Sequence, residues 1–452
     1  MRPSRRRRPG ELLRSAAIAL LALAGPPQGG ITAQPPVAAP ARTLVRAGRL
    51  IDGLSDAPRR DQGVLIVGDR IAAVGPYDSV AAAAGAATRV DLSAMTVLPG
   101  LIDAHTHIFL QGPGYDAQVL MESVPYRTLR AGVAARIALT NGFTTLRDLG
   151  TEGAMYADAD VQKAIARGVI QGPRLIIASL GLAPSGAYPL SGYAWELKMP
   201  SGVEVADGVE AVRLAVRTQV KFGAEWIKTY ADRRNRIGAD GRLHTTVNWT
   251  DEEFRAMVDE AHRLGVRVAA HATGYEGIDA ALRAGVNSIE HGDGMTPDLL
   301  DRLRRQRVYW CPTIFVGARP RPVADTLRDT QSALKARALT DAIRRGAGDL
   351  IAYGTDVGGF SWHEPTEPQA RDFTYLVRYG MTPMQAIKSA TTVAARLLGE
   401  EATTGAVAPG RRADLIAVAE DPLRDVAALE RVHWVMRAGV TYHGAAATRG
   451  ER

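Results

Sequence analysis

The amino-acid sequence predicts an α/β fold: a (β/α)8 TIM barrel with a small β-sandwich domain formed by both chain ends. Between residues 99 and 399, eight apolar strand-like segments alternate with helical ones, at a spacing of roughly 20–50 residues. Short β-like segments occur before and after this region, which indicates a second, smaller sheet built from both ends. A length of 452 residues suits one large catalytic domain with a smaller one beside it.

The N-terminus has the composition of a secretory signal peptide over residues 1–33. A run of four arginines precedes an apolar stretch at residues 15–24, and small and polar residues come next. Because this stretch is too short to span a bilayer comfortably, we expect cleavage within the segment and export to the periplasm or the medium. An uncleaved membrane anchor is the alternative. A linker rich in Pro and Ala, residues 34–41, follows.

The net charge of +7 does not indicate a nucleic-acid partner. Residues 1–40 hold six arginines and one glutamate, which leaves a charge of only +2 for the rest of the chain. No basic stripe occurs there, so we expect no nucleic-acid binding. With 46% hydrophobic and 23% charged residues, the composition excludes large-scale disorder. Cys311 is the only cysteine and lies in an apolar segment, so no intrachain disulfide can form and a structural role is expected.

The small sheet domain is expected to combine residues 42–98 with residues 400–445. Its β-like segments are residues 43–46, 63–67, 70–74, 413–418 and 432–436. Gly68 and Asp69, between two of these segments, are typical of a hairpin turn.

The catalytic barrel is expected over residues 99–399. Its candidate strands begin near residues 99, 143, 174, 224, 266, 286, 308 and 350. Two helix starts can be identified between or after them: Thr250 with Glu253 forms a capping box, and Thr382 precedes a first-turn proline. Active sites of this fold lie at the C-terminal ends of the strands, where chemically active side chains are therefore expected.

Six polar residues stand at such positions. His105 and His107 end an apolar run in a His-x-His pattern, so in a strand both imidazoles lie on one face and can bind one cation. Each of the other four ends a further apolar segment. The six candidate metal ligands are His105, His107, Lys228, His271, His291 and Asp356. Imidazole and carboxylate suit zinc, with manganese, cobalt or nickel as alternatives.

The presence of Lys228 among these ligands suggests a chemical modification. An ammonium group beside two divalent cations would be repelled, whereas a lysine carboxylated by CO2 offers two anionic oxygens that bridge two metals. Two ions roughly 3.5–4 Å apart hold a bridging hydroxide that attacks a carbonyl. Asp356 is the expected catalytic residue, which takes the proton from the attacking water and delivers it to the leaving nitrogen.

Three further positions have expected roles near the site. Tyr230 shares a strand face with Lys228 and is a candidate substrate-binding residue. His363 follows the last strand and is the second such candidate. Arg147 and Asp148 end the second strand, where we expect a structural ion pair between them.

These motifs resemble the amidohydrolase superfamily over nearly the whole mature chain. The segment from Leu98 to His107 looks like its metal-binding signature, and the segment from Gly410 to Leu415 looks like its C-terminal sheet motif. A narrower likeness is to the secreted Xaa-Pro or Xaa-Lys/Arg dipeptidase, imidazolonepropionase-like and ochratoxin-hydrolysing group. The segments that carry it are residues 142–150, 172–175, 224–230, 270–272 and 288–292.

The resemblance implies a carboxylated Lys228 that bridges two zinc ions, with Asp356 as the proton shuttle. It also implies hydrolysis of the amide bond of dipeptides or N-acyl amino acids, with ochratoxin-type molecules among the candidate substrates. The chain departs from many relatives at residues 184–189, where a Gly-Gly-His segment is common. Because this loop helps to line the mouth of the site, the departure bears on substrate identity.

Two other functions are alternatives to this one. A cyclic-amide hydrolase, such as one that opens an imidazolone or hydantoin ring, would use the same metal centre. A metal-stabilised binding protein without activity is the alternative from another class, and the presence of both Lys228 and Asp356 argues against it. The expected partner is a small molecule, and the sequence leaves a homo-oligomer open.

Overall fold

The computed structural model of the protein describes residues 40–112, 114–188, 190, 192–319, 324–364 and 368–444. The predicted signal peptide and most of the predicted linker lie outside these residues. In the part of the chain that is described, no helix combines the length and the apolar character needed to cross a membrane.

Both ends of the described chain meet in one seven-stranded sheet, in the order β18-β17-β16-β4-β1-β2-β3. Its strands are β1 (Arg42–Leu50), β2 (Arg59–Val67), β3 (Arg70–Pro76), β4 (Thr88–Pro99), β16 (Leu415–Val418), β17 (Val432–Arg437) and β18 (Val440–His443). β2 and β3 pair antiparallel around Gly68 and Asp69, which confirms the predicted hairpin. Central β4 pairs parallel with β1 and antiparallel with β16, so strands from the two ends are neighbours. The β-sandwich form of this domain stays a prediction.

Alternate residues of β4 and β16 pack on opposite faces of this sheet. Val97 and Leu415 belong to the core of the sheet itself, whereas Leu98 and Ile416 belong to the large core of the helical region. This alternation follows from the two-residue repeat of a strand. The next strand begins at Leu101, directly after β4, and leads to His105 and His107.

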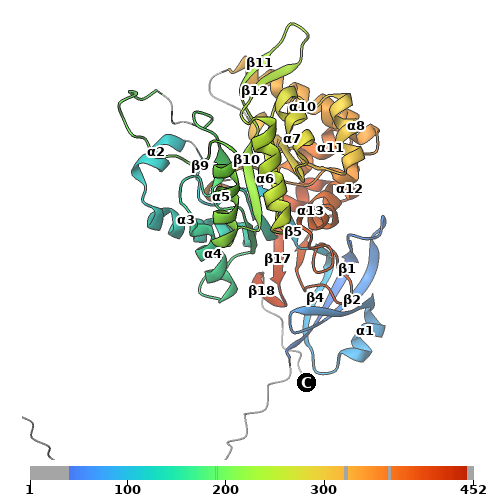
Figure 1. The fold of residues 1–452 in the computed structure, drawn as a ribbon. Helices are drawn as coiled ribbons and strands as arrows, with labels where there is room; N and C mark the ends of the chain where they lie inside the picture. Colours follow the sequence, from blue (N-terminus) through green and yellow to red (C-terminus); the bar gives the residue numbers. More distant parts are fainter. Residues whose placement is uncertain are drawn as a thin grey trace, which may run out of the picture. The chain divides into compact units, whose positions relative to one another are not determined.

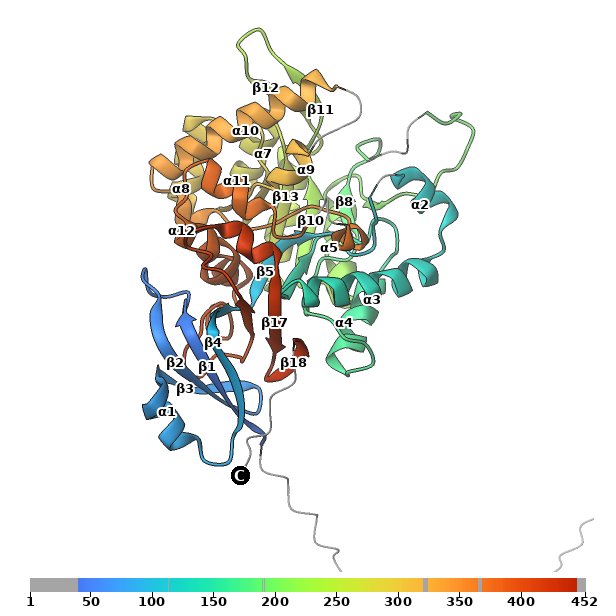
Figure 2. The same ribbon diagram turned by 180° about the vertical axis from the view of Figure 1, so that it is seen from behind.

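The middle of the chain forms a set of parallel strands surrounded by helices (Figures 1 and 2). The strands are β5 (Leu101–Thr106), β6 (Phe143–Asp148), β7 (Arg174–Ile177), β8 (Gly181–Ala183), β9 (Val203–Val205), β10 (Trp226–Tyr230), β13 (Arg267–Ala272), β14 (Ser288–His291) and β15 (Tyr309–Cys311). β5, β6 and β7 pair in that order, and β10, β13, β14 and β15 form a second parallel run. Seven of the eight predicted strand starts lie within two residues of an observed start.

Backbone hydrogen bonds join the two runs at both of their edges. On one side, the amide of Glu225 donates to the carbonyl of Ile177 at 2.9 Å. On the other, the eighth predicted strand is reduced to a single parallel pairing of Ile351 with Trp310. Just beyond it, the amide of Ala104 in β5 donates to the carbonyl of Tyr353 at 2.9 Å. Successive parallel strands therefore bring their C-terminal ends to one end of the assembly.

Helices connect the parallel strands, and the two predicted helix starts lie among them. The helices are α2 (Tyr115–Met121), α3 (Val124–Thr140), α4 (Ala157–Ala166), α5 (Val209–Lys221), α6 (Asp251–Arg263), α7 (Tyr275–Ala284), α8 (Pro297–Gln306), α9 (Ile314–Ala318), α10 (Thr326–Arg344), α11 (Asp372–Arg378), α12 (Pro383–Lys388) and α13 (Ala394–Leu398), with α1 (Tyr77–Ala84) beside the sheet. Capping boxes are present at Thr250 and Thr382. The antiparallel hairpin of β11 (Asp232–Ile237) and β12 (Leu243–Val247), next to the strand ends, was not predicted.

Candidate active site

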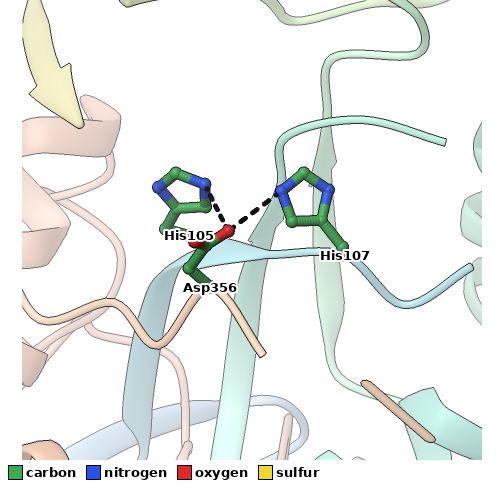
Figure 3. A group of neighbouring side chains, drawn as sticks. All are labelled: His105, His107 and Asp356. Atoms are coloured by element: carbon green, nitrogen blue, oxygen red, sulfur yellow. Dashed lines mark ion pairs between the residues drawn. The ribbon is translucent and has the colours of Figure 1, made fainter. Parts of the chain in front are cut away.

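The strand ends bring His105, His107 and Asp356 together (Figure 3). The Nε2 atoms of both histidines lie 3.3 Å from the same oxygen, Oδ1 of Asp356. Both imidazoles come from the end of β5, as the His-x-His spacing predicts. Asp356 arrives from a segment more than 240 residues later in the chain.

The backbone is held in a strained form at two of the predicted ligands. Asp356 has φ 58° and His291 has φ 70°, both in the left-handed region that non-glycine residues seldom adopt. The amide of Asp356 donates to the carbonyl of His105 at 2.8 Å. Gly354, two residues earlier, leaves room that a Cβ would fill, because that atom would lie 2.3 Å from Sγ of Cys311 and 2.8 Å from Cβ of His105. Cys311 is buried and free, which agrees with a structural role.

The Nδ1 atoms of His105 and His107 form hydrogen bonds with groups on the side of each ring that faces away from Asp356. Nδ1 of His105 lies 2.8 Å from Oε2 of Glu290, and Nδ1 of His107 lies 3.1 Å from the carbonyl of Gly150. An imidazole that donates its Nδ1 proton to such an acceptor keeps a lone pair on Nε2. Both Nε2 atoms point toward Asp356. Burial opposes ionisation of His107, but its hydrogen bond with Asp356 and the charge of Glu152 outweigh this and raise its pKa to about 9, so this ring would release a proton on binding a metal.

Arg147 does not pair with Asp148, so that prediction was wrong. Its guanidinium donates to Oε1 of Glu290 at 2.9 Å and to the carbonyl of Ala104. Asp148 instead accepts the amide of Ile108 at 2.8 Å. Adjacent side chains of a strand point to opposite faces, so a partner on a neighbouring strand is geometrically favoured over the next residue.

His271 and His291 complete the histidine cluster. Their ring centroids are 4.5 Å apart, and that of His291 is 5.1 Å from that of His105. Nε2 of His271 lies 3.7 Å from Oδ1 of buried Asp232, and Nδ1 of His291 lies 2.9 Å from Oγ1 of Thr313. Burial, and after it the charge of Lys228, lowers the pKa of His271 to about 3. This imidazole is therefore neutral at physiological pH, as a metal ligand must be.

Lys228 lies at the floor of the site. Its side chain is 1% exposed, and its Nζ is 3.4 Å from Nε2 of His105. Burial lowers the pKa of this amine, although the nearby carboxylates oppose the effect. Asp356 behaves in the opposite way: burial raises its pKa, but the charge and hydrogen bond of His105 outweigh this and hold it well below the usual value. The site thus places an ionised carboxylate among the imidazoles.

Among the residues that the structure describes, two groups of side chains have metal-ligand spacing. Ligand atoms of His105, His107 and Asp356 lie within 4.8 Å of one another, as do those of His105, Glu290 and Cys311. The second group is a poor site, because Glu290 is already held by Arg147 and burial raises the pKa of the Cys311 thiol well above its usual value. The first group fits a divalent cation, since two imidazole Nε2 atoms and a carboxylate oxygen, all of them common metal ligands, converge there.

Comparison with known proteins places this site in a family. The family model described as "Amidohydrolase family" matches residues 96–441. The chain belongs to the amidohydrolase family. Ochratoxinase from Aspergillus niger is 29% identical over 444 residues, which cover 89% of this chain and 87% of the ochratoxinase. A Xaa-Pro dipeptidase solved with methionine in its active site is 31% identical, with a TM-score of 0.76, and the match covers 89% of this chain and all of the dipeptidase. Imidazolonepropionase from Chloroflexus aggregans is 25% identical over 385 residues, covering 81% of this chain and 86% of that enzyme.

Family membership establishes the general activity. The amidohydrolase is a hydrolase that acts on carbon–nitrogen bonds. Membership of this family also implies a TIM-barrel-like α/β fold, in agreement with the parallel strands of the middle region. Members of this family generally bind divalent metals, and the group of His105, His107 and Asp356 is suited to them.

A cavity of about 350 Å³ opens above the histidines of this amidohydrolase. Its lining includes five of the six predicted ligands, with buried His105 directly beneath. Tyr230 lines the cavity as expected, but its hydroxyl donates to Oε1 of Glu152 at 3.0 Å. His363 is not among the described residues that line the cavity; its side chain is 46% exposed and forms an ion pair with Glu364. A substrate-binding role for either residue stays a prediction.

Several residues of the site were not identified from the sequence. They are Glu152, Asp232, Glu290, Thr313, Arg328 and Lys335. A signal was present for Glu290, because a carboxylate inside an otherwise apolar strand requires a buried partner. The others lie in loops, hairpins or helices, where polar residues are common.

Proposed function

We propose that this amidohydrolase is a binuclear-metal enzyme that cleaves the amide bond of dipeptides or N-acyl amino acids. One observation carries the proposal: two histidine Nε2 atoms lie 3.3 Å from one carboxylate oxygen, with Lys228 and two further histidines beside them. The similarity to a Xaa-Pro dipeptidase and to an ochratoxinase supports an amide substrate with a C-terminal amino acid.

The proposed ligands divide between two zinc ions. His105, His107 and Asp356 would hold one ion, and His271 and His291 the other. Lys228 would bridge them as a carbamate: the Nζ lone pair forms a bond to the carbon of CO2 and one proton leaves. The burial of this lysine beside His105 supports the modification, because an uncompensated ammonium group is costly in such a position.

Divalent ions held by these residues would polarise the substrate carbonyl and make water more acidic. Asp356 is then the group that moves protons. Its carboxylate lies at the cavity, takes one proton from the attacking water and gives it to the leaving nitrogen. The amine departs as the C–N bond breaks, and the acyl carbon gains the water oxygen.

The proposal is tested by amino-acid release from a panel of dipeptides and N-acyl amino acids, with the zinc-reconstituted protein. We expect release that depends on metal, and the preferred leaving residue defines the specificity. An imidazolone and a hydantoin belong in the same panel, because an imidazolonepropionase is among the relatives. Ring opening without amino-acid release would reject the proposed substrate class in favour of cyclic amides.

Two further features of this enzyme are proposals: its domain architecture and its export. We propose a closed (β/α)8 barrel over residues 99–399 and a β-sandwich domain from residues 42–98 and 400–445. We also propose export, directed by residues 1–33. N-terminal sequencing of the protein recovered from its native compartment tests the latter, since a start before residue 24 would contradict cleavage.

A further inference from the structure

A buried carboxylate with three phenol partners forms one wall of the cavity. The side chain of Glu152 is 3% exposed, and the residue lines the cavity. Its Oε2 accepts hydrogen bonds from the hydroxyls of Tyr115 and Tyr188, both at 3.0 Å, and its Oε1 accepts that of Tyr230 at 3.0 Å. The four side chains come from four separate segments, so this is a tertiary arrangement around one carboxylate.

The surrounding structure holds Glu152 in place. Its backbone has φ 52°, in the left-handed region. The guanidinium of Arg127 donates to the carbonyls of Thr151 and Glu152, both at 2.8 Å. Gly202 leaves space for the Tyr115 hydroxyl, because a Cβ there would lie 1.9 Å from it. The carboxylate is therefore positioned by contacts that a mere surface residue would lack.

Among the described residues, no basic side chain lies at hydrogen-bond distance from the Glu152 carboxylate. Its three donors are neutral phenols, and Arg127 is engaged with the backbone. Of its two oxygens, Oε2 has two donors but Oε1 has one, so Oε1 retains acceptor capacity. Nδ1 of His107 is near Oε1, at 3.6 Å, but donates to Gly150. This wall of the cavity can accept another hydrogen-bond donor, and a cation best matches its charge.

The other charged residues of the lining complete the pattern. Lys335 is paired with Asp293 at 2.7 Å and also donates to the carbonyl of Pro312, so these two charges cancel. Arg328, in the first turn of α10, is the remaining cation among the described lining residues outside the proposed ligands, and its ion pair with Asp325 is long, at 3.7 Å. The cavity thus combines one buried negative group with one accessible positive group, which complements a zwitterion.

We propose that Glu152 determines specificity by binding the free α-ammonium group of the substrate, so that this enzyme prefers unblocked dipeptides to N-acyl amino acids. Arg328 supplies the matching charge for the substrate carboxylate. This inference rests on the proposed function and selects between the two substrate classes that it contains.

The test compares an alanyl dipeptide with the propionyl amino acid that has the same leaving residue and lacks only the α-amino group. For the zinc-loaded wild type, we expect kcat/KM to favour the alanyl substrate by about 10- to 100-fold, the range for a hydrogen bond between buried charges. Glu152→Gln keeps the shape of the side chain, and its one amide oxygen can still accept the Tyr115 and Tyr188 hydroxyls. In this variant the preference should disappear through loss of alanyl turnover alone. Asp293→Asn is the matched control, because it removes a cavity carboxylate that is already paired.

The possible outcomes distinguish a failure of the proposed role of Glu152 from a failure of the proposed function. An equal loss for both substrates in Glu152→Gln, or a wild type that favours the propionyl substrate or neither, overturns the role of Glu152 and leaves amide hydrolysis standing. The wild-type comparison is decisive even if the variant fails to fold. Absence of turnover for both substrates with metal bound rejects the proposed function, and the inference with it. Loss of selectivity in Asp293→Asn as well would show a general charge effect and also overturn the inference.

Discussion

Nδ1 of His105 lies 2.8 Å from Oε2 of Glu290, and this contact orients the ring toward the centre of the site. Burial opposes ionisation of Glu290, but Arg147 and then His105 outweigh it and lower its pKa to about 2. The carboxylate is therefore anionic and accepts a hydrogen bond from the Nδ1–H group, so the ring presents Nε2 to the centre of the site. Such carboxylate–histidine pairs raise the basicity of a ligand and fix its tautomer.

Replacing Glu290 with Gln should weaken metal binding by about 10- to 100-fold, because the ring loses its charged acceptor. The measurement is metal content per chain at defined free zinc concentrations. Glu225→Gln is the control, since this carboxylate lies at the opposite end of β10, where it accepts a hydrogen bond from Gln162. Wild-type zinc affinity in Glu290→Gln would contradict the orienting role.

Replacing Asp356 with Asn should lower kcat by about 10²- to 10⁴-fold, the usual contribution of a positioned acid–base group. The amide still offers an oxygen ligand but cannot take a proton from water. Activity is measured at saturating zinc, and bound metal is determined in the same sample. Turnover close to that of the wild type, with metal bound, would exclude the proton-shuttle role.

Removal of metal by a chelator should abolish activity, and zinc should restore it faster when bicarbonate is present. Bicarbonate supplies the CO2 that the proposed carbamate of Lys228 requires. Isotopically labelled bicarbonate should give a carbamate resonance by NMR in the wild type that is absent in Lys228→Met. A fully metallated, active protein without that resonance would reject the carbamate while leaving the histidine sites intact.

The sequence was sufficient to locate seven of the parallel strands and to select the proposed ligands. Each strand is a short apolar run, and each ligand is a polar residue at the end of such a run, so both signals are local. His105 and His107 needed only the two-residue repeat of a strand. The meeting of Asp356 with these histidines followed from the expected fold rather than from any local signal.

What the sequence did not predict depends on contacts between distant segments. Glu290 and His105 are 185 residues apart, and Arg147 reaches Glu290 instead of its neighbour Asp148. Glu152 acquires its character only when tyrosines from three other segments converge on it. A single sequence contains the charges of such groups but not their distances, which arise from packing.

The contact between α5 and α6 gives a prediction about stability outside the site. Glu260 in α6 is buried and accepts hydrogen bonds from Arg213, at 3.1 Å, and from Arg217, at 2.7 Å, in α5, and it is also paired with Arg263. The bond from Arg263, then that from Arg217, lowers its pKa to about 2 against the effect of burial. An unfolded glutamate has a pKa of about 4.3, so the unfolded state binds more protons between these values.

The stabilisation by Glu260 is therefore complete above about pH 4.3 and lost as the pH falls toward 2. Glu260→Gln should reduce the free energy of unfolding by about 1 kcal/mol at pH 7, a modest amount because the arginines are partly exposed and screened by water. Urea unfolding of variant and wild type at pH 7 and at pH 3 should show this difference shrinking with acid. Glu252→Gln, at an exposed position of the same helix, is the control. A difference that stays constant between the two pH values would mean that Glu260 acts through packing rather than through its charge.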